Sequence, residues 1–84
     1  MRRVLFVDDE LRILQGLQRL MYPHRASWEM FFAPSGAEAL KAMAVKPFDV
    51  VVADMRMPGM DGAALLIKVK ELNPNAVRII LSGY

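Results

Sequence analysis

Two short apolar runs in this sequence each end in acidic residues. Residues 4–7 (VLFV) lead into the acidic triplet 8–10, and residues 50–53 (VVVA) lead into Asp54. Continuous apolar runs of this length are typical of parallel strands that helices cover on both faces. Open parallel sheets hold their ligand sites beyond the carboxyl ends of the strands, so we expect these acids to converge at one edge of a sheet.

Converging carboxylates favour a bound cation. At about 4 Å and an effective dielectric near 20, two unit negative charges repel each other by roughly 4 kcal/mol. That repulsion favours either a proton or a divalent metal in the site. An isolated acidic triplet is usually just the start of a helix, and Asp54 alone is an ordinary turn residue. The combination of two acid-terminated strands is what indicates a metal site.

Size and composition limit the other classes of function. The 84 residues suffice for one small domain, and a hydrophobic content of 55% predicts a folded core. The absence of cysteine excludes disulfides and thiolate metal sites. Eleven basic and nine acidic residues are scattered along the chain, so nucleic acid is not an expected partner. No apolar run is long enough for a signal peptide or a membrane span, which predicts a cytoplasmic protein without a membrane partner.

The pattern of apolar residues predicts four strands alternating with three helices. Apolar residues at helical spacing mark the helices, and Leu11 and Leu72 are among those expected on the buried faces of the first and third helices. Ser35 and Asp61 are expected to cap the second and third helices. Glu29 indicates that the second strand lies at a sheet edge. The alternation implies parallel strands joined by right-handed crossovers. The expected strands are residues 4–7, 28–33, 50–54 and 77–81, and the helices begin near Leu11, Gly36 and Gly62.

The residues at the ends of these strands resemble the receiver domain of two-component response regulators. The segments that carry the resemblance are residues 8–10, the string DMRMPGMDG from Asp54 to Gly62, and the pair Ser82 and Gly83. They occur in the family's order over the whole chain. The resemblance implies a flavodoxin-like, doubly wound parallel α/β sheet, whose order 2-1-3-4-5 is taken from the family.

The resemblance also implies a phosphoacceptor site with Mg²⁺ as its cofactor. Asp54 would accept the phosphoryl group, and Asp9 would bind Mg²⁺ directly with Asp8 supporting it largely through water. The backbone carbonyl of Arg56 would be a further metal ligand. These residue types suit the chemistry, because phosphoryl transfer needs an oxygen nucleophile and cations on the transferring oxygens, and Mg²⁺ prefers hard oxygen ligands.

Further positions follow from the same resemblance. Ser82 would form a hydrogen bond to the phosphoryl group, while Arg56 and Tyr84 would flank the path of the hydrolytic water and slow dephosphorylation. The partner would be a sensor histidine kinase or a phosphotransfer protein, and the domain would control an output domain outside this chain. The ending from Arg78 to Tyr84 resembles receivers joined to HD-type phosphohydrolase domains. Such a module is not an enzyme, apart from slow self-dephosphorylation.

The chain departs from the family in stopping after the fourth predicted strand. We therefore expect residues 1–84 to be a single receiver domain, truncated to four strands and three helices (βαβαβαβ). The family's lysine that pairs with the phosphoryl group has no counterpart, since Lys68 and Lys70 belong to the third helix. Losing one such cation typically slows transfer by about 10²- to 10³-fold. The fourth strand would be a bare edge, which predicts a homodimer or larger assembly.

Two other functions stay open at this point. A phosphatase of the haloacid-dehalogenase type also uses an aspartate at a strand end, but it has a second acid two residues later, where this chain has Arg56. The chain could instead be a structural dimerisation fragment that is never phosphorylated. A nucleotide-binding domain ranks last, because no glycine-rich fingerprint follows the first strand.

Overall fold

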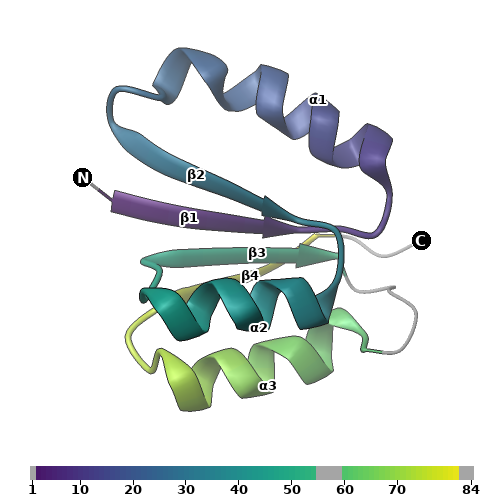
Figure 1. The fold of residues 1–84 in the computed structure, drawn as a ribbon, viewed down its shortest axis with the longest axis vertical. Helices are drawn as coiled ribbons and strands as arrows, with labels where there is room; N and C mark the ends of the chain where they lie inside the picture. The colour runs from purple at the N-terminus through teal and green to yellow at the C-terminus, as the bar shows by residue number, and fades with distance from the viewer. Residues whose placement is uncertain (1, 55–59, 82–84) are drawn as a thin grey trace.

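The computed structural model describes residues 2–54 and 60–81, which form one parallel sheet with helices on both faces (Figure 1). The sheet order is β2-β1-β3-β4, which agrees with the order implied for the family. The strands are β1 (Arg2–Val7), β2 (Trp28–Ala33), β3 (Val50–Asp54) and β4 (Val77–Leu81). The helices are α1 (Leu11–Met21), α2 (Gly36–Val45) and α3 (Gly62–Leu72), with a short 3-10 helix at Tyr22–His24.

The predicted α/β class and element order are confirmed by this arrangement. The strands β2 and β4 have the predicted bounds, while β1 begins at Arg2, two residues earlier than the apolar run. Glu29 lies half-buried on β2, which is an edge strand as expected. The register pairs Val7 of β1 with Ala53 of β3, so the two acid-terminated strands end side by side.

Both faces of the sheet are covered, which explains why the central strands are apolar without alternation. Leu5 and Val51 are fully buried toward α2 and α3, where they pack with Leu65 and Val69. The opposite face packs against α1 through one cluster of buried residues. Its members are Val4, Phe6, Leu14 and Val52.

Side-chain caps begin two of the helices at the predicted residues. The Ser35 hydroxyl accepts a hydrogen bond from the Glu38 N–H (3.1 Å) at the start of α2. The Asp61 carboxylate accepts one from the Ala64 N–H (2.7 Å) at the start of α3. Each cap satisfies a backbone donor that has no partner within its helix.

Two apolar residues that helical spacing assigns to the core are instead exposed. Leu11 is 64% exposed and Leu72 is 54% exposed. They are the first residue of α1 and the last residue of α3, so they lie at helix ends rather than over the middle of the sheet. Helical spacing identifies the face on which a residue lies, but not how far the sheet extends beneath it.

The outer strand β4 carries several exposed apolar side chains. Val77, Ile79 and Ile80 are 56%, 44% and 39% exposed, whereas Leu81 packs against the core on the α1 side.

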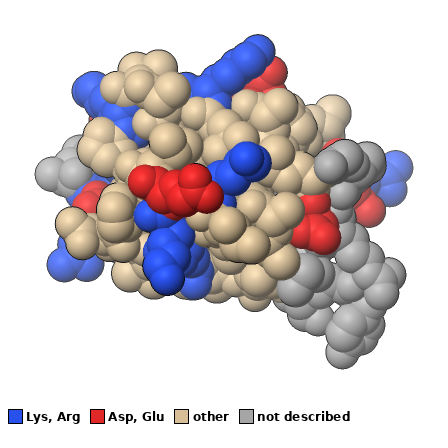
Figure 2. All heavy atoms as spheres, turned by 90° about the horizontal axis from the view of Figure 1, so that it is seen from below, with Lys and Arg blue, Asp and Glu red and all other residues tan. Residues whose placement is uncertain are grey.

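Seen from the α3 side, basic and acidic side chains of the described residues are interspersed without a continuous basic patch (Figure 2). None of the described helices is long and apolar enough to cross a membrane.

Candidate metal centre

Three carboxylates meet where β1 and β3 end. One oxygen from each of Asp8, Asp9 and Asp54 lies within 4.8 Å of the others. Asp54 is the last residue of β3, and Asp8 directly follows β1. Because Val7 and Ala53 are register partners, the parallel pairing brings these acids together over 46 residues of sequence. The structure thus brings together three of the four acids that the sequence analysis expects at this edge.

Asp8 is the most buried of the three acids, with 5% of its surface exposed, and backbone groups hold it in place. Its N–H donates to the Ala33 carbonyl at the end of β2 (3.1 Å). One of its carboxylate oxygens accepts a hydrogen bond from the Glu10 N–H (2.9 Å). No feature of the local sequence predicts the contact with Ala33, which depends on the pairing of β1 with β2. The contact with Glu10 is an Asx turn, in which an aspartate side chain accepts a hydrogen bond from the N–H two residues later in the chain.

The environment of Asp8 raises the pKa of its carboxyl group above the ordinary value. Burial is the main cause, and the negative charges of Asp54, Asp9 and Glu10 act in the same direction. The hydrogen bond from the Glu10 N–H opposes them by stabilising the ionised form. A cation at the cluster would reverse the balance, because it would favour the charged form of all three acids.

The donor set suits a hard divalent cation. Oxygens about 2.1 Å from an octahedral Mg²⁺ lie roughly 3 Å apart when adjacent and roughly 4.2 Å apart when opposite. The three oxygens lie within 4.8 Å of one another, so the side chains would draw closer together to occupy adjacent positions around one ion. Because all three converging groups are carboxylates, the cluster suits Mg²⁺ better than zinc, which prefers nitrogen and sulfur.

The neighbouring acids have other roles. Glu10 is the N-cap residue of α1 and is exposed, and it is absent from the group of converging oxygens among the described residues. Asp61 caps α3, as its position in the sequence predicts. The remaining residues of the predicted site, Arg56, Ser82 and Tyr84, lie outside the described residues. Leu81, which precedes Ser82, is the register partner of Asp54.

Comparison with known protein families agrees with the sequence resemblance. Residues 4–84 match the family model described as the response regulator receiver domain. The chain is 40% identical over 81 residues to the DNA-binding transcriptional regulator NtrC from Escherichia coli (strain K12). That alignment covers 96% of this chain but 17% of NtrC, so the chain spans only a small part of this curated relative.

Solved structures show the same fold. The signal receiver domain of an HD domain-containing protein from Pseudomonas fluorescens Pf-5 superposes with a TM-score of 0.91 at 34% identity, covering 99% of this chain and 65% of that one. The response regulator TrrA from Thermotoga maritima, in complex with Mg²⁺-BeF, superposes with a TM-score of 0.86 at 32% identity. The match covers all of this chain and 71% of TrrA.

Proposed function

This chain belongs to the response regulator receiver domain family, and on that premise we propose that it is a phosphoacceptor module whose accepting residue is Asp54. One observation carries the proposal: Asp54 is half-buried at a strand end, with carboxylate oxygens of Asp8 and Asp9 close by. A half-buried carboxylate stays accessible to a donor. Its neighbours supply the metal ligands that phosphoryl transfer requires.

The proposed reaction is a displacement at phosphorus. A carboxylate oxygen of Asp54 attacks the phosphorus of a phosphohistidine on a kinase or phosphotransfer protein. The oxygen–phosphorus bond forms as the phosphorus–nitrogen bond breaks, and the departing imidazole takes a proton from water.

The residues that would hold Mg²⁺ are Asp8, Asp9 and Asp54, with the Arg56 carbonyl as a further ligand. When bound, the ion supplies positive charge that offsets the charge of the transferring oxygens. Ser82 would form a hydrogen bond to a phosphoryl oxygen. The pairing of Leu81 with Asp54 supports this role, because it brings the chain before Ser82 next to the acceptor.

Incubation with a small phosphodonor, followed by intact-mass measurement, tests this function. We expect a stable gain of one phosphoryl group that requires Mg²⁺ and is lost in Asp54→Ala. Asp61→Asn is the matched control, since it also removes one negative charge but retains the capping oxygen. Rapid donor turnover without modified protein would favour a phosphatase. Absence of any reaction would favour a structural module.

Loss of the phosphoryl group is a separate property of the proposed site. Arg56 and Tyr84 stand two residues beyond Asp54 and Ser82, where they would obstruct the attacking water. Arg56→Ala should therefore shorten the lifetime of the phosphorylated protein. A half-life equal to that of the parent would contradict this role.

Two relationships to other chains complete the proposal. The domain would control an output module, and the similarity to the receiver domain of an HD domain-containing protein supports that class of output as the first to examine. The chain would also associate with a second copy through β4. The exposure of Val77, Ile79 and Ile80 on this strand supports self-association.

A further inference from the structure

We infer that Pro34 is a positioning residue for the carboxylate cluster, because it holds the Ala33 carbonyl that accepts a hydrogen bond from the Asp8 N–H. This inference rests on the proposed function, in which Asp8 joins Asp9 and Asp54 in holding Mg²⁺. The bond between Asp8 and Ala33 measures 3.1 Å and connects the residue after β1 to the last residue of β2. It therefore ties the cluster to an edge strand of the sheet.

The peptide group between Ala33 and Pro34 carries the accepting carbonyl. Two backbone rotations set the direction of that carbonyl: ψ of Ala33 and φ of Pro34. The proline ring fixes φ of Pro34 at about −65°. The ring also disfavours a helical conformation of the preceding residue, so Ala33 stays extended, as its pairing with Val7 requires. Pro34 thus restricts both rotations that could turn the carbonyl away from Asp8.

Packing holds the Ala33 side chain but not the peptide group that follows it. Ala33 is buried, whereas Pro34 is exposed in a connection of only two residues between β2 and α2 (Figure 1). A hollow of about 330 Å³ between β2 and α2 borders Ala33 and Pro34 and has Leu5 as another lining residue. Because this side of the connection is open, its stiffness comes from the proline ring.

The hydrogen bond to Ala33 matters for the metal because Asp8 is held at two points. The Glu10 N–H fixes its carboxylate group (2.9 Å), and the Ala33 carbonyl fixes its backbone. A carboxylate that is already in place loses less conformational freedom when it binds a cation. Outer groups that orient metal ligands typically contribute about 10- to 100-fold in affinity. Pro34 acts on the cluster through such a group.

Substitution of Pro34 tests this inference by NMR in chelator and by titration calorimetry with Mg²⁺. The scalar coupling across the hydrogen bond between Asp8 and Ala33 reports its geometry, and hydrogen exchange of the Asp8 amide reports its opening. Pro34→Ala should reduce the coupling and speed the exchange several-fold. It loosens the bond without removing it, so Mg²⁺ binding should weaken by about 3- to 10-fold. The Asp49 amide, which donates to the Arg3 carbonyl (2.8 Å) at the opposite end of the sheet, should keep its exchange rate.

Two further variants separate positioning from general effects of losing a proline. Pro74→Ala removes an exposed proline that follows the buried residue Asn73, in the connection between α3 and β4. It should leave the Asp8 amide and the Mg²⁺ affinity at their parent values. Pro34→Val keeps an apolar side chain of similar size but frees both backbone rotations, so it should behave like Pro34→Ala.

Three results would overturn the inference. They are an unchanged Asp8 amide in Pro34→Ala, an Asp8 amide that opens without loss of Mg²⁺ affinity, and parent readouts in Pro34→Val, which would make side-chain packing the cause. If the parent itself bound no Mg²⁺, the proposed function would fail. The coupling and the exchange rate in chelator would still decide whether Pro34 holds Asp8 in place.

Discussion

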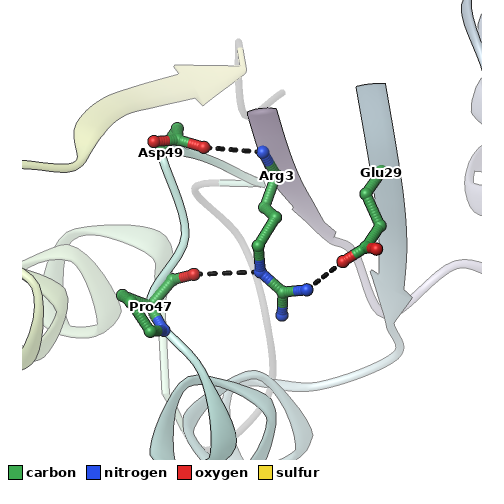
Figure 3. A network of polar contacts seen from close by, with 4 residues as sticks. All are labelled: Arg3, Glu29, Pro47 and Asp49. Carbon is green, nitrogen blue, oxygen red and sulfur yellow. Dashed lines mark hydrogen bonds and ion pairs between the residues drawn. The ribbon is translucent and has the colours of Figure 1, made fainter. Parts of the chain in front are cut away.

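Arg3 in β1 forms an ion pair with Glu29 in β2, at the end of the sheet opposite the carboxylate cluster (Figure 3). The same guanidinium group donates from its Nε to the Pro47 carbonyl (3.0 Å). The backbone N–H of Arg3 donates to the Asp49 carboxylate (2.6 Å). One residue therefore joins the starts of three elements: β1, β2 and the segment that enters β3.

Aromatic rings enclose this guanidinium group. Its central carbon lies 4.6 Å from the ring centroids of both Phe31 and Phe48, and the two rings meet edge to face. The Arg3 side chain is only 17% exposed. Partial burial makes its interactions stronger than those of a surface ion pair, which contributes about 0–1 kcal/mol.

Replacing Arg3 should destabilise the fold. Arg3→Met keeps a long apolar side chain but removes the charge and both side-chain hydrogen bonds. We expect a loss of about 1.5–3 kcal/mol in the free energy of unfolding, measured in urea. Lys68→Ala, at an exposed position of α3, is the control and should change stability by less than about 0.5 kcal/mol. Equal effects of the two substitutions would contradict the role assigned to Arg3.

Mg²⁺ should stabilise the folded protein. A ligand that binds only the folded state at 100 times its dissociation constant adds about 2.7 kcal/mol to the free energy of unfolding. Asp9→Asn should lose most of this gain because it removes a ligand charge, whereas Asp61→Asn should retain it. Thermal unfolding with Mg²⁺ and with chelator provides the measurement. An identical midpoint in both conditions would count against the metal site.

Stability without metal should depend on pH through Asp8. The pKa of Asp8 is raised in the folded state, so the folded protein holds this proton more tightly than the unfolded chain does. The stabilisation that the bound proton gives to the folded state is complete below the pKa of Asp8 in the unfolded chain, about 4. It disappears as the pH rises through the pKa of Asp8 in the folded protein. In chelator, the free energy of unfolding of the parent, measured in urea, should therefore fall relative to that of Asp8→Asn as the pH rises. A difference that rises instead would refute the assignment.

The cap of α3 should contribute measurably to stability. Asp61→Ala removes the acceptor for the Ala64 N–H, and we expect a loss of about 1 kcal/mol in urea unfolding. Asp61→Asn keeps a side-chain oxygen in the same place and should lose much less. If both variants lost the same stability, charge and not the hydrogen bond would be responsible.

Exposed residues of β4 should control self-association. Light scattering of the parent chain at micromolar concentration should give a dimer or a larger species, and Ile79→Lys should shift it toward the monomer. Ile67→Lys is the matched control, because Ile67 is 64% exposed on α3 and receives the same substitution. A parent protein that is monomeric at this concentration would disprove association through β4.

Local sequence determines most of the architecture of this domain. The period of apolar residues sets each helix and strand, and Ser35 and Asp61 start two helices because their side chains reach N–H groups three residues ahead. The acid-terminated strands also predict the carboxylate cluster, since parallel strands end at a common edge. The local sequence does not show how much of a helix lies over the sheet. Leu11, at the start of α1, is therefore exposed against expectation.

Tertiary structure decides the features that depend on distant residues. Asp8 is buried and its N–H donates to the Ala33 carbonyl at the end of β2, whereas its sequence neighbour Asp9 is exposed. Gly36 and Met60 stand 24 residues apart in sequence, yet a Cβ atom on Gly36 would lie 2.8 Å from the Met60 Sδ. The sequence by itself thus determined which elements form and that acids meet at one edge of the sheet, but not that Glu10 stays outside the cluster. The tertiary structure decided how tightly each side chain is held, because burial is a property of neighbours that local patterns do not specify.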